Sequence, residues 1–219
     1  MFLAQFGRER IAMKRILLCI LALFMIASLV SCNEYTDAQA NEIIDVLLVR
    51  EAELNAYIYG DAFETKEDPG EDVNAGTQRY YEVAEDSKYL TIASLKKAVD
   101  DLIVSTSRDG IYGYAFDGTN DEYGSRPPRF KENSVSKNID INVADNDYKL
   151  TTVALLGSAK VSRSNKTHIR ADITVFRYKS DGSFTKGTKE VEIRMENGVW
   201  KLIDQTMIGG TCETPPKQS

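Results

Sequence analysis

The chain contains a single histidine, His168, so a serine triad, a histidine-rich zinc site or a cysteine–histidine hydrolase centre would have to use it. His168 alternates with apolar residues and falls on the same side as Arg170, which predicts the polar face of a regular strand. Cys212 would be a nucleophile only if His168 came near, and it lies in a Gly- and Pro-containing stretch. We therefore expect an exposed histidine and a free thiol, and we assign no catalytic residue.

A calcium loop is the second chemistry that the residue types suggest. Asp117, Thr119 and Asp121 have the alternation of such a loop. However, Glu122 stands where the turn glycine is needed, and Pro128 stands where the bidentate glutamate is needed. This pattern predicts a turn, and we assign no metal ligand.

An acidic stretch from Asp61 to Gln78 is a candidate for partner binding. It is polar and contains hardly any apolar residue, which predicts a mobile loop. Such a loop is either simply solvated, or it mimics an anionic wall fragment or steers a basic hydrolase cleft. The candidate binding residues in it are Glu64, Glu67, Asp68, Glu71 and Asp72.

A second binding candidate is rich in tyrosine and contains the Arg126-Pro127-Pro128-Arg129 loop. Tyrosine offers a large contact area with a polar tip, so these side chains are suited to an aromatic and basic contact rim. The alternative is ordinary core packing beside a rigid loop. The candidate residues here are Tyr112, Tyr114 and Arg126, with Tyr123 beside them.

Two helices are expected to position these residues. Thr36 and Gln39 have the spacing of a capping box, and apolar residues then recur at three- and four-residue steps up to Gly60. Thr91 is expected to cap a second helix that runs to Ile103. A short strand over Arg79–Val83 separates the two helices.

The second half of the chain is typical of an antiparallel meander. Alternation predicts strands over 111–116, 138–143, 148–161, 168–175, 190–195 and 199–207. Asp181-Gly182 and Asn197-Gly198 are hairpin signals. We expect residues 209–219 to form a C-terminal tail.

The N-terminal segment predicts export. Lys14-Arg15 precede an apolar run from Ile16 to Val30, which is too short to span a bilayer comfortably and is typical of a secretory signal. Met13 directly precedes this basic pair, so we expect translation to start there. Leu29-Val30-Ser31-Cys32 resembles the lipobox of bacterial lipoprotein precursors, and this resemblance implies cleavage before Cys32 and acylation of its thiol.

The resulting boundaries are a signal peptide over 1–31, a lipidated N-terminus and short tether over 32–35, one α+β domain over 36–208, and the tail. The whole chain has a net charge of −6, and residues 1–31 carry four basic and one acidic side chain, so the mature chain carries −9. An acidic surface argues against nucleic acid as a partner. With Cys32 acylated, no intramolecular disulfide is available to the mature domain.

The order of elements, ending in Gly198-Val199-Trp200-Lys201-Leu202, resembles the cystatin-like, nuclear transport factor 2-like fold. This resemblance implies N-terminal helices packed against a curved antiparallel sheet that forms a cone. The stretch from Asp86 to Lys97 resembles exported Firmicutes members that include secreted D,L-endopeptidase inhibitors. A related cone-shaped fold supports isomerases with a cavity aspartate, but the alternation points Asp172 and Asp204 outward.

We therefore predict a lipid-anchored, extracytoplasmic α+β protein of the bacterial cell envelope, held on the cell membrane or on the outer membrane of a two-membrane envelope. Its expected role is to bind or inhibit an envelope protein such as a cell-wall hydrolase, without catalysis, cofactor or nucleic acid. The alternative is a carrier that binds a small ligand in the cone cavity.

Overall fold

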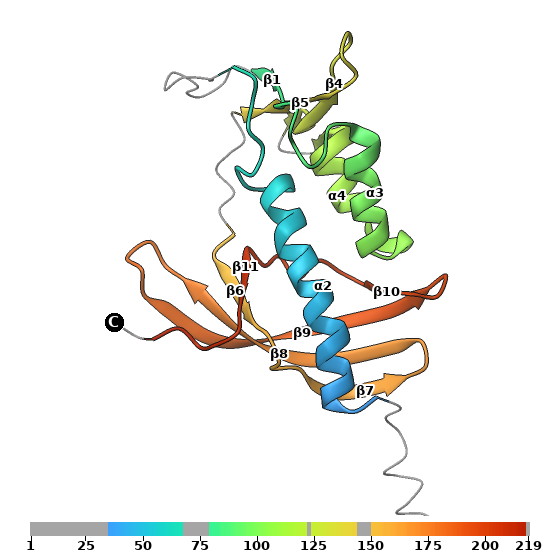
Figure 1. Cartoon of the computed structure of the whole chain (residues 1–219), viewed down its shortest axis with the longest axis vertical. Helices are drawn as coiled ribbons and strands as arrows, with labels where there is room; N and C mark the ends of the chain where they lie inside the picture. The colour runs from blue at the N-terminus through green and yellow to red at the C-terminus, as the bar shows by residue number, and fades with distance from the viewer. Residues whose placement is uncertain (1–34, 68–78, 122–123, 144–149, 218–219) are drawn as a thin grey trace, which may run out of the picture.

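Helix α2 (Asp37–Ile58) is the element against which the rest of the chain packs in the computed structural model, which describes residues 35–67, 79–121, 124–143 and 150–217 (Figure 1). The predicted capping box is confirmed: the Gln39 amide donates to the Thr36 hydroxyl, and the Gln39 side chain accepts from the Thr36 amide. The helix buries one stripe of side chains along its whole length.

The large sheet has six strands and curls strongly around α2. Its centre is the long hairpin of β8 (His168–Tyr178) and β9 (Phe184–Glu196), which turns at Asp181-Gly182 as predicted. β10 (Val199–Leu202) pairs with β9 across the Asn197-Gly198 turn. β6 (Thr152–Leu155) and β7 (Lys160–Asn165) pair with opposite halves of β8.

The last strand corrects two predictions. β11 (Gly210–Cys212) lies parallel to β6 and forms one edge of the sheet, so the sheet is mixed and not purely antiparallel. The segment expected to be a free tail from Gly209 onward therefore begins as a strand. A three-residue strand carries little pattern of its own, and the pairing is supplied by β6 from far along the chain.

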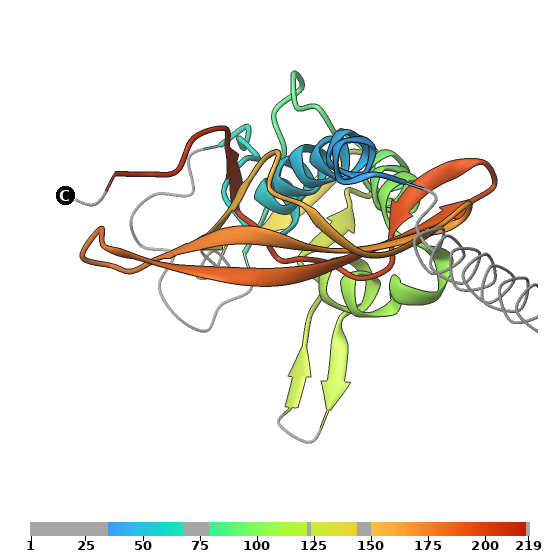
Figure 2. The same ribbon diagram turned by 90° about the horizontal axis from the view of Figure 1, so that it is seen from below.

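The concave face of the large sheet holds α2, as Figure 2 shows from below. The predicted alternation along β8 is confirmed, because one face of it is buried and the other is half-buried or exposed. The side chains that join sheet and helix in one core include Ile44, Leu48, Ile169, Ala171, Ile173, Val191 and Ile193.

A smaller sheet lies beyond the C-terminal end of α2. Its strand order is β1 (Tyr80–Glu82), β5 (Ile139–Asn142) and β4 (Phe130–Glu132), all antiparallel. The predicted helix α3 (Ile92–Leu102) connects β1 to the short turn η1 (Ser105–Ser107) and helix α4 (Asp109–Tyr112). Figure 1 shows α3 and α4 between the small sheet and β10.

The strand predicted over 111–116 is wrong. Helix α4 continues into a π-helical turn, η2 (Gly113–Asp117). Ile111 and Ala115 are four residues apart and both are buried, and Tyr112 and Phe116 pack edge to face at 5.5 Å. This four-residue spacing is typical of a helix. The strand prediction rested on the alternation of the aromatic residues and did not take this spacing into account. The run predicted over 148–161 is likewise divided, because Gly157 turns the chain between β6 and β7 with a φ of 70°.

A ladder of polar side chains runs along the buried stripe of α2. Glu51, Asn55 and the cap residue Tyr59 follow one another at four-residue steps and all bond to the segment after β10, residues 205–208. Asn55 Nδ2 donates to the Ile208 carbonyl at 2.9 Å, and the Tyr59 hydroxyl donates to Gln205 Oε1 at 2.8 Å. The ladder therefore fixes on the helix a loop that has no regular pairing in the sheet.

Glu51 makes the densest contact of this polar ladder and is fully buried. One carboxylate oxygen accepts from the amides of Thr206 (2.6 Å) and Met207 (3.1 Å), and the other accepts from the Thr206 hydroxyl. These bonds hold Met207 at a φ of 53°, a left-handed conformation that few side chains adopt. Burial raises the pKa of Glu51, and the hydrogen bonds from Thr206 oppose that rise.

We predict that Glu51→Gln folds with near wild-type stability, because the amide oxygen still accepts from both backbone amides while the cost of burying a charge is removed. Glu51→Ala leaves those donors unpaired and should lose about 3 kcal/mol or more of unfolding free energy. Because the pKa of Glu51 is raised in the folded state, its contribution to stability falls as pH rises from the usual glutamate value of 4.5 toward the native value.

Urea unfolding from pH 5 to pH 8 measures both effects. The Glu51→Gln variant should gain stability relative to wild type as pH rises, and Glu42→Gln, exposed on the same helix, is the control that should not. A parallel pH dependence for wild type and Glu51→Gln would contradict this account.

Candidate partner-binding surface

The β2–β3 hairpin projects away from the body of the molecule (Figure 2). β2 (Thr119–Asp121) and β3 (Gly124–Arg126) pair only with each other, in the register Thr119↔Arg126 to Asp121↔Gly124. All three residues of β3 are exposed, as are Thr119 and Asn120 on β2. Of the alternating residues Asp117, Thr119 and Asp121, the first ends η2 and the other two lie on β2.

Gly118 sets the angle at which this hairpin leaves the body. Its φ is 74°, and a Cβ there would lie 2.7 Å from the Arg126 carbonyl oxygen and 3.2 Å from the Pro128 ring. Both the backbone conformation and the space therefore require glycine. The following Pro127-Pro128 stiffens the returning chain, so the base of the hairpin is rigid.

Two of the predicted contact residues meet at this base. The Arg126 guanidinium lies 4.9 Å from the centre of the Tyr114 ring, a cation–π contact. Tyr114 stacks on Tyr59 with 5.0 Å between ring centres and 28° between planes. Since Tyr59 also bonds to Gln205, the hairpin base is connected through this stack to the polar ladder of α2.

Tyr112 does not join this rim. Its hydroxyl donates to Asp100 Oδ1 on α3 at 2.6 Å, and Lys96 lies 5.0 Å from its ring centre. Burial and the bond to Asp100 raise the pKa of Tyr112 to about 12. The predicted group of Tyr112, Tyr114 and Arg126 is therefore split: Tyr112 ties α4 to α3, and Tyr114 and Arg126 form the hairpin base.

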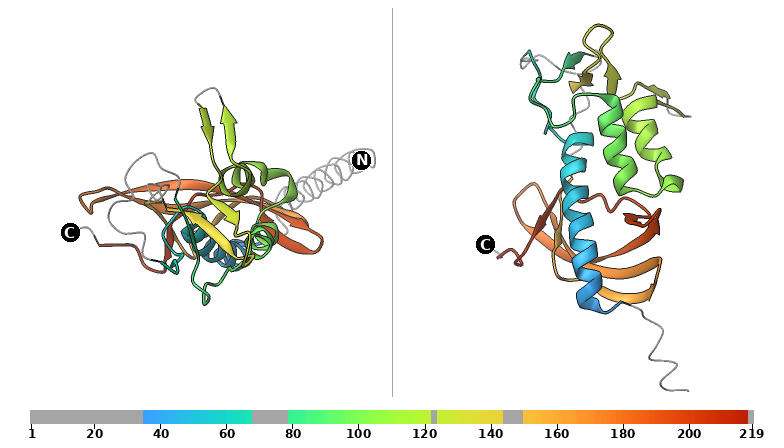
Figure 3. Two further views of the ribbon diagram at one scale, coloured as in Figure 1. Left: turned by 90° about the horizontal axis from the view of Figure 1, so that it is seen from above. Right: turned by 45° about the vertical axis from the view of Figure 1, so that its right-hand side comes forward.

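The acidic candidates lie partly outside the described residues. Glu64 and Glu67 are exposed, and Asp68, Glu71 and Asp72 fall outside the described ranges. The start of the expected loop is ordered, because Thr65 forms an isolated bridge with Val83 and extends the small sheet beside β1. Figure 3 shows β1 and the hairpin on different sides of this part of the molecule, so the described start of the acidic stretch, which lies beside β1, is apart from the hairpin.

The candidates for catalysis lie apart from one another. Cys212 on β11 is level with the far half of β8, six residues along that strand and roughly 20 Å from His168. Burial raises the pKa of the Cys212 thiol, the opposite of an activated nucleophile. His168 is half-buried, with Nε2 3.8 Å from Glu192 Oε2. Asp172 and Asp204 are exposed, as their alternation predicted.

Sequence comparison with protein-family models finds no match, and comparison with curated proteins finds none either. No helix in the described ranges combines the length and apolar character needed to cross a bilayer. The same ranges hold no group of three or more His, Cys, Asp or Glu side chains arranged to bind a metal.

The sequence analysis did not identify three polar side chains that the structure buries. Glu51 and Asn55 fall at helical spacing within the apolar stripe of α2, between Leu47 and Ile58, and that position was the available signal. Arg129 is fully buried behind the hairpin base, where Nη2 donates to the Gly60 carbonyl at 2.5 Å. In the sequence Arg129 belongs to the basic loop, and nothing in that pattern predicts its burial.

We predict that Gly118→Ala costs about 1–3 kcal/mol of unfolding free energy, because the new Cβ collides with the Arg126 carbonyl in a conformation that alanine rarely adopts. Gly110→Ala is the matched control: nothing lies within 4 Å of a Cβ there, and α4 is helical, so this change should be neutral or slightly stabilising. Thermal and urea unfolding measure both. Equal losses for the two variants would show that the hairpin base is not constrained.

Proposed function

We propose that this protein is a lipid-anchored extracytoplasmic binding module that contacts an envelope protein through its β2–β3 hairpin. The observation that carries the proposal is the hairpin itself, a pair of exposed strands anchored only at a rigid base. A two-stranded hairpin is marginally stable alone and adds little to the core. We therefore assign this hairpin a role in recognition rather than in stability.

The chemistry of the hairpin suits a protein partner. Its exposed side chains are small and polar at Thr119, Asn120 and Ser125, and Arg126 adds a cation held in place by Tyr114. Unpaired strand edges also offer backbone groups to a partner strand. Because Gly118 and the Tyr59–Tyr114 stack already fix the base, little conformational entropy is lost on binding.

The predicted lipid anchor determines which end of the domain lies near the membrane. The Tyr35 amide donates to Ser164 Oγ at 3.0 Å, and its ring packs edge-on against Trp200 at 5.6 Å, so the domain begins firmly at one end of the large sheet. Cys32 is three residues earlier, a reach of about 10 Å. With Cys32 acylated, the small sheet lies at the end of α2 farther from the membrane (Figure 1), and the hairpin projects from that part of the molecule across the axis of α2 (Figure 2).

The cystatin-like fold that we expect from the sequence favours an inhibitor over a carrier. A curled sheet wrapped around one long helix is consistent with the cystatin-like arrangement. The resemblance to D,L-endopeptidase inhibitors favours a cell-wall hydrolase as the partner. The carrier alternative requires space on the concave face of the sheet, where α2 and buried residues such as Ile173 and Ile193 pack.

Photo-crosslinking tests the proposal directly. A benzophenone amino acid at Ser125 should capture an envelope protein in living cells, whereas the same probe at Val135, which is 89% exposed on the β4–β5 turn, should not. Replacing residues 119–126 by a Gly-Ser linker should abolish capture and relieve inhibition of wall lysis, while the melting temperature stays near wild type. Capture from Val135 alone, or full inhibition by the linker variant, would contradict a binding role for the hairpin.

A further inference from the structure

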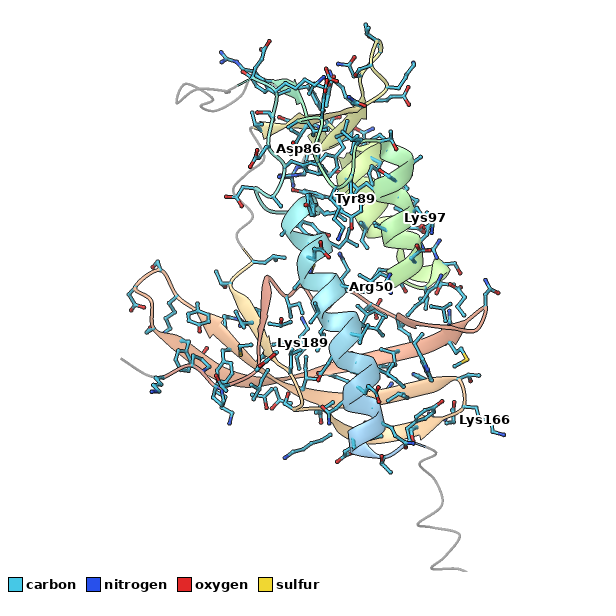
Figure 4. The ribbon with its side chains drawn as sticks, in the orientation of Figure 1. Arg50, Asp86, Tyr89, Lys97, Lys166 and Lys189 are labelled. Atoms are coloured by element: carbon cyan, nitrogen blue, oxygen red, sulfur yellow. The ribbon has the colours of Figure 1, made fainter. Side chains whose placement is uncertain are left out.

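A hollow of about 370 Å³ lies between α2 and α3, apart from the hairpin. Figure 4 shows Arg50 on α2, Lys97 on α3 and Tyr89 on the preceding loop gathered where the two helices face each other. Its volume is within the range of small-molecule sites. The lining residues are Arg50, Glu53, Leu54, Lys88, Tyr89, Ser94, Lys97, Ala98, Asp101 and Leu102.

The charges of this hollow leave one cation uncommitted. Lys88 forms an ion pair with Glu53, and Lys97 pairs with Asp101 at 2.5 Å. Among the described residues, the Arg50 side chain takes part in no ion pair or hydrogen bond. The hydrogen bond from Lys97 is the main cause that lowers the pKa of Asp101, and the charge of Arg50 lowers it further. Arg50 therefore has a planar set of donors open to a ligand, and the hollow has a net charge of +1.

Apolar surface surrounds this arginine. Leu54 and Leu102 are buried in the wall of the hollow, with Ala98 half-buried beside them. Val46 and Val49 are 57% and 46% exposed, and they lie four and one residues before Arg50 on α2. Covering these exposed valines would remove apolar surface from water, which favours a ligand that extends over this patch.

The combination selects one class of ligand by its charge. A cation would be repelled by the net charge of +1, and phosphate has no N–H or apolar groups to match the carboxylates and the apolar wall. A monoanion with N–H groups satisfies both signs, because Arg50 binds a carboxylate in bidentate fashion and the carboxylates accept amide or ammonium donors. A small aliphatic group fits the apolar wall.

We propose that the α2–α3 hollow binds the C-terminal carboxylate of a short aliphatic peptide, with Arg50 as the carboxylate partner. This site goes beyond the proposed function, since it shares no residue with the hairpin. The ligand carboxylate lies against the Arg50 guanidinium, its amide faces Asp101 or Glu53, and its terminal methyl groups contact Leu54 and Ala98.

Titration of the full-length protein with N-acetyl-dialanine, followed by NMR amide shifts, tests this assignment. A ligand of this size should bind with a Kd of about 1 mM. Its C-terminal amide, which lacks the charge, should bind at least about tenfold more weakly, and so should the acid to Arg50→Gln. Arg177→Gln, an exposed arginine on β8, is the matched control and should bind like wild type.

Three results would overturn the proposal: equal affinity for acid and amide, wild-type affinity in Arg50→Gln, or no saturable shift of hollow residues up to roughly 20 mM ligand. Inorganic phosphate, used as a competitor, should not displace the peptide, and displacement would assign the site to anions in general. The variant with the linker in place of residues 119–126 should bind the peptide normally. Failure of the hairpin to recognise a protein and failure of this hollow to bind a peptide are thus separate outcomes.

Discussion

The buried carboxylate of Glu51 imposes the constraint on which the rest of the structure depends. A carboxylate inside a protein must find hydrogen-bond donors, and here the donors are backbone amides of residues that leave the sheet after β10. The chain after Leu202 is thereby turned along α2 and delivered to β6, where β11 completes the sheet. One helix position thus determines the course of the C-terminal segment.

The same helix joins the two sheets. Its first half fills the concave face of the large sheet. At its C-terminal end Tyr59 stacks on Tyr114, and Tyr114 in turn contacts Arg126 at the hairpin base. Arg129 reinforces this junction by donating to the carbonyl of Gly60, just beyond the helix. The hairpin that we propose as a binding element therefore rests on a scaffold that runs along α2 from the large sheet to the small sheet.

Features encoded by neighbouring residues were predictable from the sequence. Capping boxes at Thr36 and Thr91, the turn at Asn197-Gly198 and the two-residue period of β8 all follow from local chemistry, and the structure confirms them. The strand β11 and the lack of an ion pair at the Arg50 side chain among the described residues depend on distant segments, so no local pattern could reveal them. The helical turns over α4 and η2 did have a local signal, the four-residue spacing of Ile111 and Ala115. For the proposed binding surface, residue type placed Tyr112, Tyr114 and Arg126 in one group, and only the packing of α4 against α3 separates Tyr112 from the contacting pair Tyr114 and Arg126. The lipidation signal at Cys32 lies outside the described residues and stays a prediction.

Native-state hydrogen exchange tests the central claim that the polar ladder of α2 makes both sheets one cooperative unit. The amides of Thr206 and Met207, which donate to Glu51, should open with the same free energy as Ile193 in the large sheet and Ile139 in the small sheet, within about 0.5 kcal/mol. Exchange of Ile139 several kcal/mol more easily than Ile193, with Thr206 following neither, would show two independent units and contradict the account.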